Sequence, residues 1–125
     1  MKNVIIYTPP ATAKRTIAKK ITDEMSGKVG TVQTCSEILV IDPKSFEKTA
    51  RENVVVCLGF IDADPREMSK RLPNYSVAQF ELFIRQSRDI KAFAEKYNVK
   101  YFDLSNAKDL DHVDEIVAFI KSNLT

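Results

Sequence analysis

Residues 3–22 read Asn-Val-Ile-Ile-Tyr-Thr-Pro-Pro-Ala-Thr-Ala-Lys-Arg-Thr-Ile-Ala-Lys-Lys-Ile-Thr, and this stretch decides the fold. Its apolar run at positions 4–7 predicts a buried strand. Pro9 and Pro10 then end the strand, because proline has no N–H to donate to a ladder. From position 14 on, apolar residues recur with the period of a helix. A strand, a short loop and a helix in this order predict the first unit of an α/β fold.

The rest of the chain continues to alternate between strands and helices. A continuous apolar run at 54–60 predicts a central parallel strand that is covered on both faces. Other patterns predict strands at 29–34 and 99–102 and helices at 43–52, 65–72, 76–97 and 110–124. The short run at 38–41 fits either a strand or a helical turn. We therefore expect a single domain, residues 1–125, in which a mostly parallel sheet is flanked by helices in a three-layer α/β architecture.

Capping patterns mark where three of these helices begin. Asp42 and Asp64 each precede a proline, which suits the first helical position because an N–H there would have no helical partner. Ser76 and Gln79 have the spacing of a capping box. Because helix capping explains both aspartates, we assign them no further chemistry.

Composition limits the function classes. The chain has 19 Lys and Arg against 17 Asp and Glu, and the net charge of +2 is too small to indicate nucleic-acid binding. No apolar run approaches the roughly 18 residues of a membrane span. The first strand begins too early for a signal peptide. We therefore expect a cytoplasmic protein that does not contact a membrane.

The cysteines and the single histidine do not form a pattern typical of a metal site or a catalytic site. Two cysteines and one histidine do not favour a zinc site. Cys35 and Cys57 could be paired by their number alone, but a reducing cytosol disfavours a disulfide. His112, near the start of the last helix, is expected to be an ordinary surface histidine.

The first loop has the layout of a phosphate-binding P-loop, whose pattern is G-x-x-x-x-G-K-[ST]. The matching residues begin with Thr8 and read Thr-Pro-Pro-Ala-Thr-Ala-Lys-Arg. Lys14 occupies the lysine position, whereas Thr8 and Ala13 replace the two glycines. Both replacements are expected to carry a steric cost, because glycine alone adopts strained loop conformations freely.

The predicted phosphate site consists of Ala13, Lys14, Arg15 and Thr16. Backbone N–H groups at the start of a helix attract an anion. Lys14 there opposes the positive end of the helix dipole, which is unfavourable unless an anion is bound. The competing interpretation is a solvated lysine without a ligand.

Arg15 stands where a P-loop has the hydroxyl residue that binds Mg²⁺. A guanidinium group repels a cation and cannot ligate it. We therefore expect no metal site here and no Mg-ATP phosphoryl transfer. Binding of an anion or a nucleotide is still compatible with these residues.

The stretch resembles the loop of the P-loop kinases of the adenylate-kinase and shikimate-kinase type, which commonly runs Gly-Pro-Pro-Gly-Ser-Gly-Lys-Ser-Thr. Pro9, Pro10, Lys14 and Thr16 match that loop. Residues 34–38, Thr-Cys-Ser-Glu-Ile, are similar to a Ser-Ser-Asp-Glu-Ile stretch that many of these kinases carry after the second strand. The resemblance implies a P-loop-kinase-like fold and ATP or another nucleotide as ligand.

The resemblance also implies roles for residues beyond the loop. Glu37 and Asp62 would be acidic residues that serve the substrate. Arginines around the lid would clamp phosphates: Arg66, Arg71, Arg85 and Arg88. The competing interpretation is that these arginines are exposed helix charges paired with nearby carboxylates.

Three interpretations therefore stay open. The first is a catalytically weakened P-loop kinase-like domain that binds a protein partner or a phosphate-containing small molecule. The second is an active nucleotide or metabolite kinase with a divergent loop, in which carboxylates such as Glu37 or Asp62 hold the metal. The third is an unrelated flavodoxin-like or Rossmann-like binding domain. Strand order separates the third from the others, because a P-loop kinase arranges the second strand and the apolar strand differently about the first.

Overall fold

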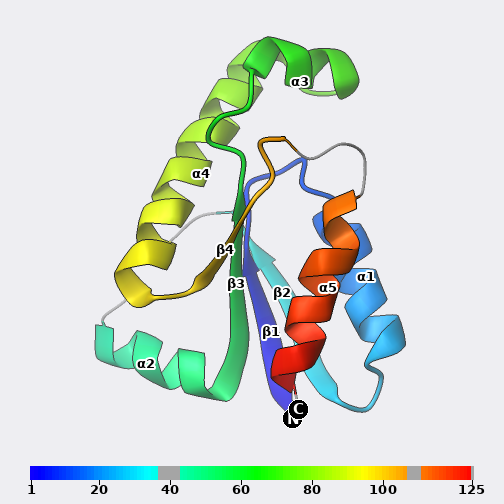
Figure 1. Cartoon of the computed structure of the whole chain (residues 1–125), viewed down its shortest axis with the longest axis vertical. Helices are drawn as coiled ribbons and strands as arrows, with labels where there is room; N and C mark the ends of the chain where they lie inside the picture. The colour runs from blue at the N-terminus through cyan, green and yellow to red at the C-terminus, as the bar shows by residue number, and fades with distance from the viewer. Residues whose placement is uncertain (37–42, 107–110, 125) are drawn as a thin grey trace.

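Parallel strands form the centre of the computed structural model, which describes residues 1–36, 43–106 and 111–124. Within these residues the sheet has four strands in the order β2-β1-β3-β4 (Figure 1). Their bounds are β1 Lys2–Tyr7, β2 Val29–Cys35, β3 Asn53–Gly59 and β4 Lys100–Asp103. Each neighbouring pair is parallel. The predicted α/β class with a mostly parallel sheet is confirmed, and the described sheet is parallel throughout.

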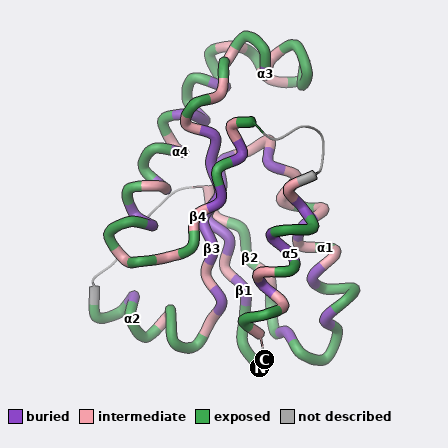
Figure 2. Tube along the Cα trace, in the orientation of Figure 1, coloured by how far each residue is buried: buried purple, intermediate pink, exposed green. Residues whose placement is uncertain are grey.

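Helices cover both faces of this sheet and complete three layers (Figures 1 and 2). Their bounds are α1 Lys14–Glu24, α2 Pro43–Glu52, α3 Pro65–Arg71, α4 Val77–Tyr97 and α5 Asp111–Leu124. Helices α1 and α5 pack together over one face, where Ile17 and Ile116 are fully buried. Helices α2 and α4 cover the other face, where Phe46 and Phe93 meet edge to face with ring centroids 5.1 Å apart. The short helix α3 packs against the first part of α4, beyond the end of the sheet (Figure 1).

Strand β3 confirms the strongest prediction from the sequence. It lies beside β1 in parallel register, with Val54 opposite Val4 and Val56 opposite Ile6. Val54, Val56 and the residues that follow to the end of the strand are buried. A continuous apolar strand is stable here because helices exclude water from both of its faces.

The helix caps that the sequence predicts are present where the structure describes them. The side chain of Asp64 accepts a hydrogen bond from the backbone N–H of Arg66 at 2.9 Å. Ser76 and Gln79 form the reciprocal capping box of α4. Asp42 and the apolar run at 38–41 lie outside the described residues.

The register of the sheet rules out a disulfide between the two cysteines. Tyr7 of β1 lies opposite Cys35 of β2 on one side and Cys57 of β3 on the other. The cysteines are therefore two strand spacings apart, about 9.6 Å. A disulfide needs Cα atoms within about 7 Å, and both thiols are free.

Within residues 1–36, 43–106 and 111–124, no helix combines the length and the apolar character needed to cross a membrane.

Candidate functional site

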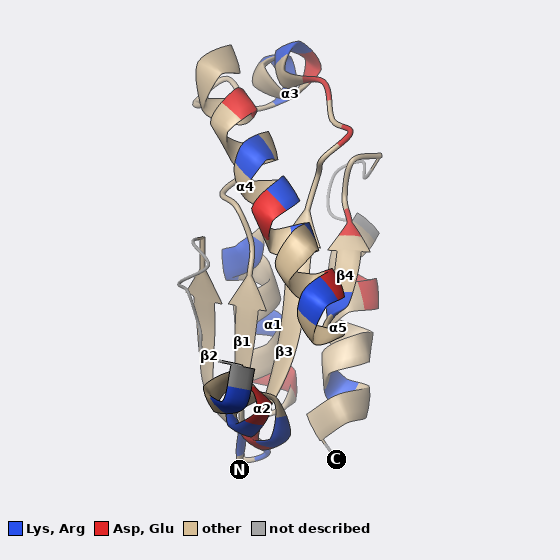
Figure 3. Cartoon of the chain, turned by 90° about the vertical axis from the view of Figure 1, so that its left-hand side faces the viewer, with Lys and Arg blue, Asp and Glu red and all other residues tan. Residues whose placement is uncertain are grey.

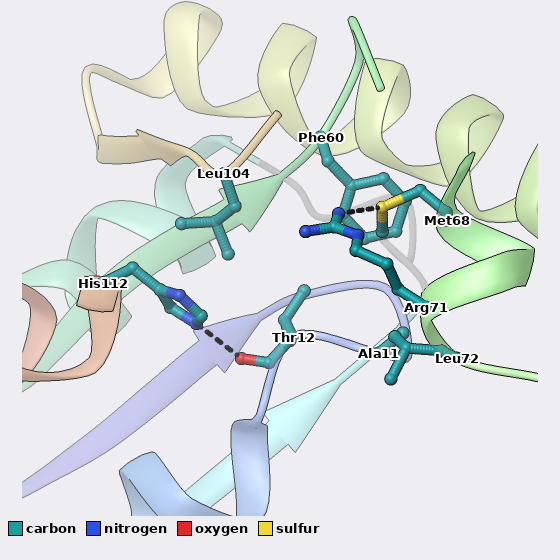
Figure 4. Close-up of a pocket in the computed structure, with 8 residues that line it drawn as sticks. All are labelled: Ala11, Thr12, Phe60, Met68, Arg71, Leu72, Leu104 and His112. Atoms are coloured by element: carbon teal, nitrogen blue, oxygen red, sulfur yellow. Dashed lines mark hydrogen bonds between the residues drawn. The ribbon is translucent and has the colours of Figure 1, made fainter. Parts of the chain in front are cut away.

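A cavity of about 150 Å³ opens at the carboxyl ends of the strands (Figure 4). Its walls come from the loop after β1, from the residues after β3 and β4, and from α3 and α5. The lining residues are Ala11, Thr12, Phe60, Met68, Arg71, Leu72, Leu104 and His112. In doubly wound sheets with the order 2-1-3-4, ligands bind at the β1/β3 switch point. The cavity lies at that point, between the loops that follow β1 and β3.

The loop after β1 is filled by its own side chains. Thr8 and Thr12 are only 0% and 2% exposed, and their Oγ1 atoms lie 2.5 Å apart. Both hydroxyls also lie within hydrogen-bond distance of the carbonyl oxygen of Pro9, at 3.0 and 3.3 Å. The N–H of Thr8 donates to the carbonyl of Cys35 at 2.9 Å, which ties the loop to the end of β2. The inside of the loop is therefore occupied by two hydroxyl groups.

Two alanines of this loop adopt the left-handed conformation that favours glycine. Ala11 has φ 70° and Ala13 has φ 58°. Ala13 stands at the second glycine position of the P-loop pattern, so the steric cost expected there is confirmed. Thr8, at the first glycine position, does not have a positive φ. The expected backbone cost at Thr8 is wrong, because the side chain fits inside the loop through the hydrogen bonds described above.

The start of α1 brings the four predicted phosphate-site residues together. Ala13 is the N-cap residue, and the first helical hydrogen bond runs from Ile17 N–H to the Ala13 carbonyl at 3.1 Å. The N–H groups of Lys14, Arg15 and Thr16 precede this bond and have no helical acceptor. Among the described residues no side chain caps this terminus, and its first turn contains no acidic residue. Two cations, Lys14 and Arg15, stand there instead, and Arg15 is exposed.

His112 belongs to the site, although its sequence context indicated only an ordinary surface histidine. It is half-buried in the first turn of α5, and its Nε2 lies 3.1 Å from the carbonyl oxygen of Thr12 (Figure 4). A carbonyl can only accept, so Nε2 carries the hydrogen in this contact. No motif surrounds this histidine, and the sequence holds no signal that would have placed it against a loop 100 residues away.

The four predicted lid arginines do not converge on one point. Arg71 lines the cavity, and its guanidinium group donates to the sulfur of Met68 at 2.9 Å. Arg85 and Arg88 lie on α4 and line a separate depression beside Glu81. Arg66 is exposed at the start of α3. Basic and acidic residues are both spread along α3 and α4 (Figure 3). Of the four predicted arginines, Arg71 alone lines this cavity.

The structure describes one of the two predicted acidic residues. Asp62 is exposed in the turn after β3, and its N–H donates to Oγ of Ser105 at 3.0 Å. Glu37 lies outside the described residues. In the part of the chain that the structure describes, no three His, Cys, Asp or Glu side chains gather in a way that could hold a metal ion.

Two ionisable groups, Cys57 and Tyr101, pack on the face of the sheet that α4 covers. Burial raises the pKa of the Cys57 thiol to about 12. Burial also raises the pKa of Tyr101, on neighbouring β4, and the carboxylates of Asp103 and Asp62 add to the effect. Both groups are therefore neutral at physiological pH.

No protein-family model matches this chain, and no curated protein matches it closely enough to be taken as a relative.

Proposed function

We propose that this chain is a non-catalytic binding domain whose ligand carries a phosphate or a similar anionic group. The start of α1 would hold that group through the N–H groups of Lys14, Arg15 and Thr16 and through the side chain of Lys14. A nucleotide such as ATP is the ligand class that the P-loop resemblance suggests. A cytoplasmic location and a protein partner on the same surface are parts of this proposal.

One observation carries the proposal. Helix α1 begins at the carboxyl end of β1 without an acidic residue or a side-chain cap among the described residues, and with Lys14 and Arg15 in its first turn. Two cations at the positive end of a helix dipole destabilise the helix unless an anion is close. An anion would pair with the N–H groups, the dipole and both side chains at once.

Strand order bears on the origin of the domain. The order β2-β1-β3-β4 is that of flavodoxin-like sheets and supports the third interpretation, an unrelated doubly wound binding domain. Descent from the P-loop kinases, which would make this chain a pseudoenzyme, rests on the motif residues alone. Anion binding at the start of α1 follows from either origin, because the N–H groups and the dipole do not depend on ancestry.

A phosphate titration followed by backbone amide NMR tests the proposal. We expect saturable shifts confined to residues 11–17, with a dissociation constant on the order of 1 mM, which corresponds to a binding free energy of about −4 kcal/mol. The variant Lys14→Ala should weaken binding. Lys28→Ala is the matched control, because Lys28 is exposed after α1 and away from the helix start. No saturable shift at tens of millimolar phosphate would disprove the site.

A further inference from the structure

The cavity at the carboxyl ends of the strands has an apolar floor. The floor consists of Phe60, Met68 and Leu104, which are exposed by only 1%, 6% and 8%. The cavity volume is about 150 Å³, and an engineered protein cavity of about 150 Å³ binds benzene. Met68 adds a thioether, which makes favourable contacts with aromatic rings. The size of the cavity and the chemistry of its floor therefore suit one aromatic ring.

The polar side chains beside this floor are already occupied or covered. The Thr12 hydroxyl lies within hydrogen-bond distance of the Thr8 hydroxyl and of the Pro9 carbonyl. His112 donates from Nε2 to the Thr12 carbonyl, and its other nitrogen, Nδ1, is buried and out of reach of a ligand. Neither side chain therefore offers a polar atom to a molecule in the cavity, so the part of a ligand that lies on the floor must be apolar.

The rim of the cavity carries a positive charge. Arg71 is exposed, and it is the one Lys, Arg, Asp or Glu among the eight residues that line the cavity. Figure 4 shows its guanidinium group turned toward the space between Leu104 and Thr12. The group donates to the Met68 sulfur at 2.9 Å, and a thioether is a weak acceptor. A carboxylate would form a stronger, charge-assisted hydrogen bond with the same guanidinium group.

An anionic group at this rim would not have to leave water. Because Arg71 is exposed, a group that pairs with it stays in contact with solvent and avoids the cost of burying a charge. No Asp or Glu lines the cavity, so no lining side chain repels an anion. The cavity therefore suits a molecule with an apolar ring at one end and an anionic group at the other.

We propose that this cavity binds a small aromatic acid, whose ring lies on the apolar floor and whose anionic group pairs with Arg71. The place agrees with the rule that doubly wound sheets bind ligands at the switch point between β1 and β3. None of residues 13–16 lines the cavity, so this site is distinct from the phosphate site proposed at the start of α1 and does not depend on it.

Benzoate, benzamide and acetate are matched probes for this site. Benzoate and benzamide have similar shapes and only benzoate is charged, whereas acetate has the charge without the ring. Binding of each probe to the full chain is measured from the methyl NMR signals of Met68 and Leu104. We expect saturable shifts with benzoate, an affinity about five-fold higher than that of benzamide, as one exposed ion pair allows, and no saturable shift with acetate. Equal affinities of benzoate and benzamide, no saturable shift with benzoate, or saturable shifts with acetate would overturn the proposal.

Variants of Arg71 separate the charge from the ring site. Arg71→Met removes the charge and keeps an unbranched stem, so it should abolish the preference for benzoate while benzamide still binds. Arg71→Lys keeps the charge and should retain part of the preference. Arg88→Met is the matched control, because it removes an exposed arginine of α4 that lines a different depression, and it should leave both affinities unchanged. A preference for benzoate that survives in Arg71→Met contradicts the role assigned to Arg71.

The aromatic-acid site and the phosphate site fail separately. Phosphate binding is observed at the amides of residues 11–17, and benzoate binding at the methyl groups of Met68 and Leu104. Benzoate shifts confined to those amides would place benzoate at the start of α1 and overturn the aromatic-acid site. Benzoate binding at the methyl groups without any phosphate binding would overturn the proposed function and keep the aromatic-acid site.

Discussion

The hydroxyl groups of Thr8 and Thr12 lie 2.5 Å apart inside the loop between β1 and α1, and both residues are buried. This pair fills the inside of the loop whose sequence aligns with the P-loop pattern. Pro9 and Pro10 supply no N–H at all to this loop. The anion site that we propose is therefore confined to the first turn of α1, which begins at Lys14.

The first prediction concerns this buried pair. Thr12→Val keeps the shape of the side chain and removes its hydroxyl, so the Thr8 hydroxyl loses one of its two partners. We expect the free energy of unfolding to fall by about 1–2 kcal/mol, the cost of a lost buried hydrogen bond. Urea unfolding gives the value. Thr34→Val, at an exposed position on β2, serves as control and should change stability by less than about 0.5 kcal/mol.

The second prediction uses the left-handed conformation of Ala13. Ala13→Gly removes a conformational cost of about 1–2 kcal/mol in the folded state, while the more flexible glycine adds about 0.5–1 kcal/mol to the cost of folding. We expect a net gain in stability of up to about 1 kcal/mol, measured by urea or thermal unfolding. Ala18→Gly, in the interior of α1, should lower stability by about 1 kcal/mol. If both variants lose stability, Ala13 is not left-handed in solution.

The third prediction concerns the contact between Gly59 and Tyr101. A Cβ added at Gly59 would lie 2.6 Å from Oη of Tyr101 and 3.0 Å from Cβ of Ser87. Gly59→Ala should therefore lower stability by about 1–3 kcal/mol, the usual cost of overpacking a core.

A double variant isolates the Oη contact. Tyr101→Phe removes a buried hydroxyl that has no hydrogen-bond partner within the described residues, so we expect it to be nearly neutral. Combined with Gly59→Ala, it should recover part of the lost stability. Equal losses with and without the Tyr101 hydroxyl would show that Ser87 carries the clash.

Local sequence patterns predict the parts of this fold that depend on near neighbours. The apolar run of β3 and the Ser76–Gln79 capping box each specify one local structure, and both are confirmed. The position of a motif glycine predicted the left-handed conformation of Ala13, but the same rule failed at Thr8.

Features that depend on tertiary contacts were not predictable in this way. Strand order depends on the face over which each connecting helix crosses, and no single strand encodes that choice. The contact of His112 with Thr12 joins residues 100 positions apart. Neither residue carries a motif that points to the other, and the cavity exists only because α5 packs against the loop.

The fourth prediction concerns stability at alkaline pH. Burial raises the pKa of Cys57 from 9.0 to about 12 in the folded chain. Between these values the unfolded chain has lost this proton and the folded chain still holds it, so the free energy of unfolding falls as pH rises. The contribution of one such group reaches about 1.4 kcal/mol per pH unit.

The variant Cys57→Ala tests this contribution. Tyr7 and Tyr101, whose pKa values are also raised by burial, keep their effects in both proteins. The difference between wild type and variant therefore reports Cys57. We expect the unfolding free energy of the wild type, measured in urea at several pH values from about 9 upward, to fall more steeply than that of the variant. Parallel curves would contradict a thiol that stays protonated in the folded state.

The last prediction is that the chain does not turn over ATP with Mg²⁺, and that restoring the metal ligand does not change this. Arg15 places a cation where a hydroxyl would bind Mg²⁺, so the wild type should hydrolyse ATP well below about 1 s⁻¹, the low end of the kinase range. Arg15→Ser returns the missing hydroxyl. Activity should still be absent, because the Thr8–Thr12 pair continues to fill the loop and leaves no space for a phosphate chain. Lys14→Ala, measured in the same assay, gives the background from any contaminating enzyme. Turnover above that background in Arg15→Ser alone would show that the side chain at this position, and not the filled loop, prevents phosphoryl transfer.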